Sequence, residues 1–448
     1  MILLSGLFGT DGVRGEANRD LAPELALKLG QACSRLVEAG GTVLVGRDTR
    51  RSGSMIQSAL SSGITSVGLN VLDAGIIPTP ALPLLEKHHG ASLAAMISAS
   101  HNLARDNGIK FFNSQGYKLS EDAEEQIEKA LASELETTRV YGSDIGKVCR
   151  LSEARNQYLD LLKGSVVEGH APFKGLKVLV DCANGATYCV APGLLRDLGA
   201  NVSSMGDQPD GDNINLNCGS TEMEALKQRM EAGNFDVGVA YDGDGDRALF
   251  VDENGAVVDG DQVLFLVASW LQKKDLLNPP LVIATVMSNL GLEKSLEKMG
   301  VELLRVQVGD RFVAEKLREA GALAGGEQSG HIIFPRYSPT GDGLITTLQI
   351  LKILVASGEP LSELADRMEW YPQVLENVET ENKNRFSLNG AIGEAIEEWE
   401  EILGDRGRIL VRPSGTQSVI RVMVEASDKQ LTARAAKEIA GEIERELN

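Results

Sequence analysis

The chain has 448 residues, a length that suggests about three domains. Its composition, with 43% hydrophobic residues, only 4% aromatic residues and 48 glycines, suits an α/β enzyme with many tight turns between strands and helices. The net charge of −20 argues against general binding of nucleic acid or of an anionic membrane surface, so an anionic substrate needs basic residues gathered locally.

The cysteines and the apolar segments predict a cytoplasmic protein. The five cysteines are an odd number without metal-ligand spacing, which indicates reduced thiols rather than a disulfide framework. The segment Met1–Gly6 lacks the basic start of a signal peptide. The longest apolar run, Val263–Leu271, is too short to span a bilayer.

Short apolar runs alternate with amphipathic stretches from Thr42 onward, which predicts parallel strands joined by helices. In chain order the first expected elements are a strand at 43–45, a helix at 54–67, a strand at 71–72, a helix near Leu82 and a strand at 94–97. The same rhythm restarts at Lys177–Val180 and at Leu281–Ala284. Three α/β domains are therefore expected.

The last part of the chain has a different pattern. Strands are expected at 374–378, 408–411 and 419–424, with helices at 391–402 and from Thr432 onward, which predicts a small α+β domain. The expected domain limits are 1–150, 151–255, 256–369 and 370–448.

The segment Asp242–Arg247 reads Asp-Gly-Asp-Gly-Asp-Arg and is the best candidate for an ion site. Alternate positions of a tight loop point the same way, so Asp242, Asp244 and Asp246 converge as hard oxygen donors, while glycine allows the bends. Mg²⁺ held by a few carboxylates keeps positions open for phosphate oxygens. The segment therefore predicts a catalytic divalent-cation site.

Two other interpretations of this segment are a calcium loop and a solvated acidic turn. The aspartates fit positions one, three and five of the helix-loop-helix calcium pattern, and Glu253 fits position twelve. Position six, however, is Arg247 instead of glycine, and the flanks 236–241 and 248–251 alternate like strands. Both features favour the catalytic site over the calcium loop.

Ser100 and His101 follow directly after the expected strand at 94–97, at the end of a sheet where α/β proteins place ligands. A hydrolase nucleophile is one interpretation, but the Gly-x-Ser-x-Gly elbow is absent. The other interpretation is a serine that carries a phosphoryl group, with its oxygens bound to the metal of the Asp242 loop. Lys110, on the expected return strand, is a candidate for acid/base work, with an exposed structural lysine as the alternative.

Four further loops carry polar or basic groups. Arg14 lies in the glycine-rich loop 9–15, and the segment 46–50 follows a strand; each alone could be a turn with solvated charges. The segment 325–331 offers Glu327, Ser329 and His331, the mixture of donors and acceptors that sugar hydroxyls need. In the last domain a phosphate cradle without a Walker loop is predicted from Arg412, Ser414, Gly415, Thr416 and Arg421.

Together these motifs resemble the α-D-phosphohexomutases. The resemblance rests on Phe8–Gly15, Ser98–Asn102, Asp242–Arg247, Gly326–His331 and Arg412–Thr416, and runs from residue 8 to about 425. It implies four domains around a central cleft, three of them related α/β domains and the last a small C-terminal α+β domain of the TATA-box-binding-protein-like fold. The chain departs from the family pattern at Leu103 and at Gln417-Ser418, which leave the ligand residues intact.

The resemblance also implies residue roles. Ser100 would be the phosphoserine and, with Asp242, Asp244 and Asp246, a metal ligand. Catalytic roles would fall to Ser100, His101, Lys110, Arg247 and His331. Substrate contacts would come from Arg14, Glu327, Ser329, Arg412, Ser414, Gly415, Thr416 and Arg421.

The activity implied is conversion of glucosamine 6-phosphate to glucosamine 1-phosphate through a phosphoserine and a bisphosphorylated sugar, feeding UDP-N-acetylglucosamine and cell-wall precursor synthesis. In the family, glutamine at position 328 goes with glucosamine phosphate and methionine with the glucose and mannose enzymes, so a glucose or mannose phosphate mutase is the alternative. A phosphatase and a non-catalytic sugar-phosphate sensor are less favoured. The implied cofactors are one Mg²⁺ per subunit and an activating sugar 1,6-bisphosphate. The expected partner is a small hexosamine phosphate, without nucleic acid or membrane, and a homodimer is left open.

Overall fold

The computed structural model describes residues 6–9, 11–132, 139–166, 171–414 and 418–447. They form two compact units: one contains the residues up to Val286 together with Leu303–Asp366, and the other contains Met287–Glu302 and the residues from Arg367 onward. Within these ranges no helix combines the length and the apolar character needed to cross a membrane.

The first sheet of the first unit has six strands in the order β1-β5-β4-β2-β3-β6. They are β1 (Val13–Glu16), β2 (Thr42–Arg47), β3 (Asn70–Ile76), β4 (Leu93–Ile97), β5 (Asp106–Asn113) and β6 (Val148–Arg150). β2, β3 and β4 are parallel, as predicted, and β6, which the sequence pattern did not predict, is parallel to β3. β5 is antiparallel to both β4 and β1, and its direction relative to β4 is the one expected for the return strand that carries Lys110. The connection 98–105 is too short for a parallel crossover, which takes about a dozen residues or more.

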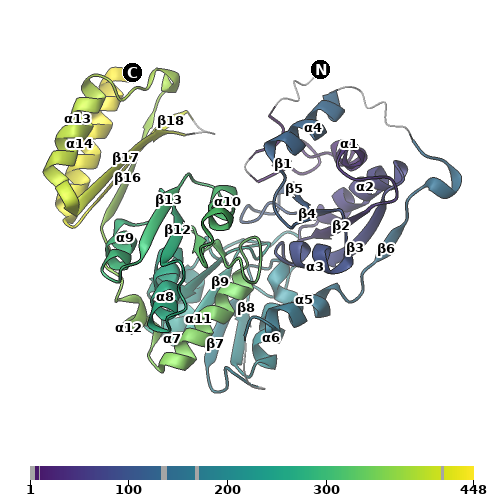
Figure 1. The fold of residues 1–448 in the computed structure, drawn as a ribbon, viewed down its shortest axis with the longest axis horizontal. Helices are drawn as coiled ribbons and strands as arrows, with labels where there is room; N and C mark the ends of the chain where they lie inside the picture. The colour runs from purple at the N-terminus through teal and green to yellow at the C-terminus, as the bar shows by residue number, and fades with distance from the viewer. Residues whose placement is uncertain (1–5, 10, 133–138, 167–170, 415–417, 448) are drawn as a thin grey trace. The chain divides into compact units, whose positions relative to one another are not determined.

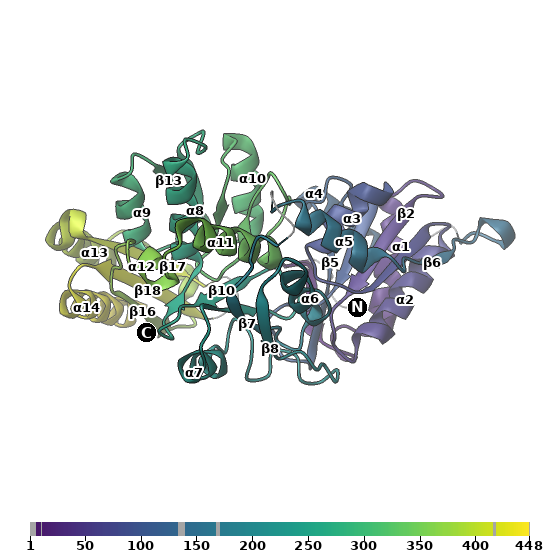
Figure 2. The same ribbon diagram turned by 90° about the horizontal axis from the view of Figure 1, so that it is seen from below.

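Helices cover both faces of this sheet (Figure 1). They are α1 (Pro23–Ala32), α2 (Gly53–Ser66), α3 (Ala81–His89), α4 (Glu121–Ala132) and α5 (Ala154–Lys163), with 3-10 turns η1 (Cys33–Arg35) and η2 (Gly142–Asp144). Apolar side chains of α1, α2 and α4 share one core with alternate strand residues such as Val43 and Val45. α3 covers the other face, and α5 lies beside α3 (Figure 2). β4 is thus buried at every position, which explains its continuous apolar run.

The second sheet has five strands in the order β11-β10-β9-β7-β8. Its elements are β7 (Lys177–Asp181), η3 (Ala186–Cys189), α6 (Ala191–Asp197), β8 (Asn201–Met205), α7 (Glu224–Ala232), β9 (Val237–Tyr241), β10 (Ala248–Val251) and β11 (Val257–Val258). β7, β8 and β9 are parallel, and β10 returns antiparallel to β9 with Ala248 opposite Tyr241. The Asp242–Arg247 segment is therefore the connection of a β-hairpin, flanked by strands as predicted.

The third sheet has the strand order β13-β12-β14-β15. Its elements are α8 (Gly260–Lys273), β12 (Leu281–Thr285), β13 (Glu302–Val306), α10 (Asp310–Ala320), β14 (Gly325–Gly326), β15 (Ile332–Ile333), α11 (Gly343–Ser357) and α12 (Leu361–Ala365). α8 starts at a capping box in which Asp259 and Gln262 satisfy each other's backbone amides. The residues 327–331 connect β14 to the antiparallel β15, so this sugar-loop candidate is also a hairpin connection.

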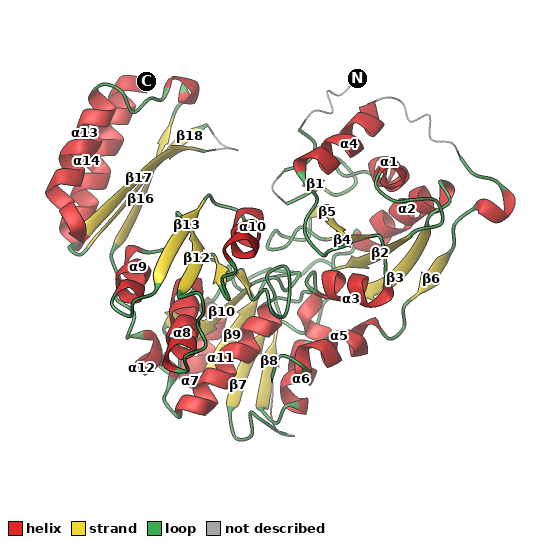
Figure 3. Ribbon diagram, viewed as in Figure 1, coloured by secondary structure: helices red, strands yellow, loops and turns green. Residues whose placement is uncertain are grey.

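The second unit has a three-stranded antiparallel sheet in the order β16-β18-β17. Its elements are α9 (Leu290–Glu297), β16 (Gln373–Glu379), η4 (Lys383–Arg385), α13 (Ala391–Leu403), η5 (Gly404–Arg406), β17 (Gly407–Pro413), β18 (Val419–Ala426) and α14 (Lys429–Leu447). α13 and α14 cover one face of the sheet (Figure 3), with Trp399 and Ile439 in the shared core. The predicted α+β pattern of this segment is confirmed.

Candidate active site

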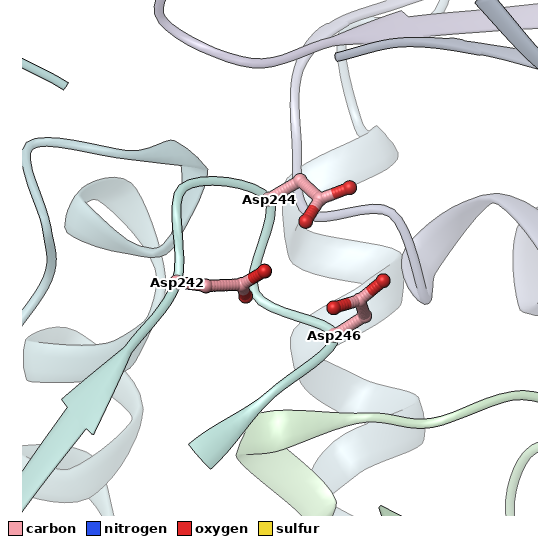
Figure 4. A group of neighbouring side chains, drawn as sticks. All are labelled: Asp242, Asp244 and Asp246. Carbon is pink, nitrogen blue, oxygen red and sulfur yellow. The ribbon is translucent and has the colours of Figure 1, made fainter. Parts of the chain in front are cut away.

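The β9–β10 hairpin gathers the three predicted carboxylates. One ligand oxygen each of Asp242, Asp244 and Asp246 lies within 4.8 Å of the others, and all three residues are buried. In Figure 4 the carboxyl group of Asp242 extends toward those of Asp244 and Asp246, which face each other. A solvated acidic turn, one of the alternatives for this segment, is therefore wrong.

The two glycines of the loop serve different purposes. Gly245 has a φ of +74°, a left-handed conformation that favours glycine. Gly243 is needed for close approach, because a Cβ there would lie 2.6 Å from the carbonyl oxygen of Ser100. The loop can thus bend, and the Ser100 segment can come against it.

Ser100 lies just beyond the carboxyl end of β4, as predicted, and is 1% exposed. Its Oγ donates a hydrogen bond to Asp242 Oδ2 at 2.6 Å, and His101 Nδ1 lies 3.5 Å from the same Oγ. Its φ of +51° is rare for a residue with a side chain and marks a strained position that the surroundings must hold. The structure thus brings the serine and the carboxylate triad together.

Arg50 is the principal support of the Ser100 segment, and its role was not anticipated from the sequence. It is 1% exposed, and its Nε donates to Asp48 Oδ2 at 2.9 Å. Its guanidinium also donates to four backbone carbonyls, those of Ser100, Asn102, Leu103 and Asp106. The interpretation of segment 46–50 as a turn with solvated charges is therefore wrong for Asp48 and Arg50.

The Asp48 carboxylate extends this support to the backbone of Ser100. Ser98 Oγ donates to Asp48 Oδ2 at 2.7 Å and accepts from the amide of Ser100 at 2.9 Å. From the connection between β8 and α7, Asn215 Nδ2 donates to the carbonyl of Ser100 at 2.8 Å. No motif in the sequence marked Asn215.

Lys110 is buried inside the site, so the alternative of an exposed structural lysine is wrong. Its Nζ lies 2.9 Å from Asp244 Oδ2 and 3.5 Å from Asp246 Oδ2. Burial alone would lower the pKa of Lys110, but the nearby carboxylates outweigh it and raise the pKa, so the side chain is an ammonium. Thr79 Oγ1 also donates to Asp244 Oδ2, at 2.6 Å.

The carboxylate loop fits a hard divalent cation. Asp244 Oδ1 and Asp246 Oδ1 are buried and have no hydrogen-bond partner within the described residues. Burial, and then the neighbouring carboxylates, raises the pKa of Asp242 well above its usual range, which indicates a deficit of positive charge. Oxygen donors of this kind suit Mg²⁺. The strands on both sides of the loop exclude the helix-loop-helix calcium motif.

Basic side chains lie near Ser100. Burial, followed by the positive charges of Arg247 and Arg14, lowers the pKa of His101, whose Nδ1 lies 3.5 Å from Ser100 Oγ. The buried Nε atoms of Arg247 and Arg14 lack hydrogen-bond partners within the described part of the chain. These donors can receive the oxygens of an anion.

The sugar-loop candidate adjoins the carboxylate loop. The amide of Ala248, next to Arg247, donates to the carbonyl of Gly330 at 3.1 Å. Within the loop, Glu327 Oε1 accepts from the amide of Gly309 at 3.1 Å, and Ser329 Oγ donates to Glu327 Oε2 at 3.5 Å. The first unit therefore brings Glu327 and Ser329 close to the predicted metal loop.

His331 is linked to the first sheet through a lysine that the sequence reasoning did not consider. His331 is 2% exposed, and its Nε2 lies 3.6 Å from Asp310 Oδ2. Lys118 Nζ lies 2.7 Å from Asp310 Oδ1 and 2.6 Å from Asp11 Oδ1. Asp11 in turn pairs with Arg14 at 3.1 Å.

The predicted phosphate cradle lies in the second unit. Arg412 on β17 is directly opposite Arg421 on β18, and burial followed by the charge of Arg421 lowers the pKa of Arg412. Like charges opposite each other cost free energy in a sheet, so this pair is suited to an anion. Lys383 Nζ donates to the carbonyl of the buried Ser414 at 3.1 Å. Gly415 and Thr416 lie outside the described residues.

The fold has three α/β parts, each built on its own sheet, and a small α+β unit. In its site a serine hydroxyl contacts a buried triad of carboxylates. Together these features define a phosphohexomutase. Family models of phosphoglucomutase/phosphomannomutase match the chain as alpha/beta/alpha domain I over residues 5–138, domain II over 156–255, domain III over 259–371 and the C-terminal domain over 375–442. The chain belongs to this phosphoglucomutase/phosphomannomutase family.

Relatives named phosphoglucosamine mutase match nearly the whole chain. The one from Carboxydothermus hydrogenoformans is 49% identical over 98% of this chain and 99% of its own length. The one from Listeria innocua is 46% identical over 98% of each chain. The resemblance stated from the motifs is confirmed.

Solved structures share the fold. A phosphoglucomutase/phosphomannomutase family protein from Burkholderia thailandensis has a TM-score of 0.82 at 24% identity, covering 99% of this chain and 98% of that one. The N-acetylphosphoglucosamine mutase of Aspergillus fumigatus, solved with GlcNAc-6P and magnesium, has a TM-score of 0.70 at 17% identity, covering 98% and 96%. Four domains of the expected kinds are thus confirmed.

Proposed function

We propose that this enzyme interconverts glucosamine 6-phosphate and glucosamine 1-phosphate, with Ser100 as the carrier of the phosphoryl group. The observation that carries the chemistry is the 2.6 Å contact between Ser100 Oγ and Asp242 in a buried triad of carboxylates. The choice of sugar rests on relatives that are 46–49% identical and bear the name phosphoglucosamine mutase. We also propose that the enzyme is cytoplasmic and that its four domains have the limits expected from the sequence.

The reaction has two phosphoryl transfers that balance. Oxygen O1 of glucosamine 6-phosphate attacks the phosphorus of phosphorylated Ser100, and the bond from phosphorus to Ser100 Oγ breaks. After the resulting 1,6-bisphosphate has turned over, Ser100 Oγ attacks the other phosphorus and the O6 bond breaks, which releases glucosamine 1-phosphate. The proton lost by O1 is assigned to the imidazole of His331 as acceptor, and the proton gained by O6 is assigned to the ammonium group of Lys110 as donor.

Asp242, Asp244 and Asp246, with an oxygen of phosphorylated Ser100, are the residues that would hold one Mg²⁺. When bound, the ion supplies positive charge to the phosphoryl group in transfer. Arg247 and His101 are assigned to the same phosphoryl group, since both lie near Ser100 and Arg247 Nε has no hydrogen-bond partner among the described residues. Hydrogen bonds to the backbone of Ser100 hold the buried serine in its strained conformation before the reaction begins. This preorganisation reduces the entropic cost of positioning the hydroxyl.

The remaining site residues are assigned to the sugar and to its second phosphate. Glu327 and Ser329 would bind ring hydroxyls, and Arg14 an anionic oxygen. The phosphate that is not transferred is assigned to Arg412, Ser414, Gly415, Thr416 and Arg421. A sugar 1,6-bisphosphate would prime Ser100, and a homodimer stays open.

The test is a coupled assay of the purified protein with Mg²⁺ and a sugar bisphosphate activator. The value of kcat/KM is measured for glucosamine 6-phosphate, glucose 6-phosphate and mannose 6-phosphate under identical conditions. We expect the highest value for glucosamine 6-phosphate and residual turnover of glucose 6-phosphate, because the two sugars share most contacts. A higher value for glucose or mannose phosphate would reassign the sugar, and release of inorganic phosphate without sugar 1-phosphate would make the protein a phosphatase.

A further inference from the structure

A groove of about 520 Å³ in the first unit is lined by three arginines that the active site does not use. Arg47 comes from the end of β2, Arg150 from β6 and Arg155 from the first turn of α5. The other lining residues are uncharged, and they include Ser152 and Tyr188. In a chain with a net charge of −20, three arginines without a carboxylate in the lining form an unusual local concentration of positive charge.

Two of the arginines are held in place by neighbouring side chains. Arg47 Nε donates to Gln57 Oε1 at 3.0 Å, and Arg150 Nη1 lies 2.8 Å from Asp73 Oδ2. Gln57 Nε2 donates to the other oxygen of Asp73 at 2.6 Å, so one carboxylate orders both arginines. Among the described residues, no carboxylate forms an ion pair with Arg47 or Arg155. Asp73 pairs with one of the three guanidiniums and, with Asp48, attracts Arg47, so the groove keeps a partly ordered excess of positive charge.

We propose that this groove binds a small phosphorylated molecule, whose phosphate group is held by Arg47, Arg150 and Arg155. Guanidinium forks match the oxygens of a phosphate and form bidentate hydrogen bonds with them, which a single ammonium cannot do. The hydroxyl groups of Ser152 and Tyr188 are available to the rest of the ligand. The groove shares no residue with the Ser100 site or with the Arg412 cradle, so the ligand is a second one rather than the substrate.

The groove is connected to the support of Ser100. Arg47 Nη1 donates to the carbonyl of Asp48 at 3.3 Å. The Asp48 carboxylate holds Arg50 and Ser98, both of which bind the backbone of Ser100. A ligand that moves Arg47 would therefore shift the segment that carries the hydroxyl of Ser100. The groove is thus placed where a bound ligand can regulate the active site.

Binding is tested by calorimetric titration with inorganic pyrophosphate in buffer without Mg²⁺. All proteins carry Arg412→Ala, which weakens phosphate binding in the second unit. We compare this parent with Arg150→Ala/Arg155→Ala and with the control pair Arg196→Ala/Arg229→Ala, which removes the same charge from exposed positions outside the groove. Arg150 and Arg155 are exposed, so both pairs are expected to fold, and the unfolding temperature checks this.

The groove pair should weaken pyrophosphate binding at least about tenfold, since it removes two charge-assisted contacts, and the control pair should leave it within about twofold. Equal affinity in the parent and the groove pair would overturn the proposal. Equal weakening by both pairs would also overturn it, because attraction by net charge alone would then explain the binding.

The connection to Ser100 is tested by amide hydrogen exchange over residues 98–106, with and without pyrophosphate. Exchange should change on addition of pyrophosphate in the parent and in the control pair, and should not change in the groove pair. A change of the same size in the groove pair would contradict the connection. Neither measurement depends on turnover, so failure of the proposed function would leave the outcome interpretable.

Discussion

The buried guanidinium of Arg50 donates to the carbonyl oxygen of Ser100 at 3.0 Å. The same group reaches three more carbonyls of the segment and pairs with the fully buried Asp48. Ser100 has a strained backbone conformation, so this fork is what keeps the hydroxyl beside Asp242.

Two replacements of Arg50 should therefore distinguish its role in positioning Ser100 from its role in the stability of the fold. Arg50→Lys keeps the charge but cannot reach four carbonyls, so kcat should fall about tenfold or more while the substrate KM changes little. Arg50→Met leaves Asp48 buried and unpaired and should cost about 3–5 kcal/mol of unfolding free energy. Arg51→Lys, at an exposed neighbouring position, is the control. A wild-type kcat in Arg50→Lys would refute the positioning role.

Ser100→Ala should fold normally and lose activity on the order of 10³-fold or more, because no other hydroxyl occupies the same place against Asp242. The variant should also lack the mass of one phosphoryl group that appears on the wild type after priming with a sugar bisphosphate. Ser58→Ala on the exposed side of α2 should keep both properties. Intact-mass spectra of active wild type without any phosphorylated form, under every priming condition, would rule Ser100 out as carrier.

Asp244→Asn preserves shape but removes a charge from the triad, so it should weaken Mg²⁺ binding and turnover together. At a Mg²⁺ concentration of about 100 times Kd, the wild type should gain about 2.7 kcal/mol of stability, and the variant should gain much less. Thermal unfolding with and without Mg²⁺ measures both gains. Asp212→Asn, at an exposed carboxylate, should leave the gain intact. Full activity of the wild type in excess chelator would contradict a metal requirement.

The motifs were predictable because each places its chemistry in consecutive residues at the end of a strand. Asp242–Arg247 and Ser98–Asn102 could be recognised one by one, and the apolar runs before them identified β9 and β4. The contact between the two loops was not a sequence signal, since Ser100 and Asp242 are 142 residues apart. Their proximity was inferred only from the chemistry that both would share.

The supporting residues could not be predicted, because they act over long sequence separations and carry no motif. Arg50 resembled an ordinary turn residue until its burial was known. Lys118 is a single lysine after a turn, and it acquires a role only because Asp11 and Asp310 lie on both sides of it. The pairing of β5 with β1 could not be predicted, because apolar periodicity does not report which strands are neighbours in a sheet.

Lys118 should stabilise the fold through its ion pairs with Asp11 and Asp310, and this contribution to the unfolding free energy should depend on pH. Burial would raise the pKa of Asp310, but the charges of Lys118 and His331 outweigh burial and hold this pKa below its usual range. The pKa of Asp11 is also lowered, because Lys118 and other nearby cations outweigh burial. Burial would lower the pKa of Lys118, but the two carboxylates outweigh it and raise this pKa. Depressed carboxyl pKa values give stability that is present above a pH of about 4 and is lost as the pH falls through the folded-state values. The raised lysine pKa gives stability that is present below a pH of about 10 and is lost above it.

Lys118→Met should therefore be destabilised most near neutral pH, and its difference from the wild type in unfolding free energy should shrink toward pH 4 and below. Its kcat should fall about tenfold because Asp310, which lies 3.6 Å from His331 Nε2, loses the lysine that holds it in place. Denaturant titrations at several pH values measure the first effect, and Lys129→Met on the exposed face of α4 is the control. A destabilisation that does not vary with pH would show that Lys118 contributes by packing alone.

Gln328 is the position at which the sugar preference can be tested. Its side chain hydrogen-bonds to Asp259, whose pKa is raised to about 6 by burial even though backbone amides and Gln328 oppose the shift. The side-chain amide of Gln328 is thus held at the start of α8, between Glu327 and Ser329 in the sequence, and we expect it to meet an amino sugar better than a thioether would.

Gln328→Met should lower the ratio of kcat/KM for glucosamine 6-phosphate to that for glucose 6-phosphate by about tenfold, since one polar contact in such a pocket is worth a few kcal/mol at most. The value for glucose 6-phosphate should stay near that of the wild type, because Glu327, Ser329 and the Ser100 site are unchanged. Gln115→Met, at an exposed turn, controls for the added methionine. Equal losses for both sugars would mean that Gln328 holds the loop in shape without selecting the sugar, and the preference would then have to come from Glu327, whose carboxylate can attract the ammonium group of glucosamine.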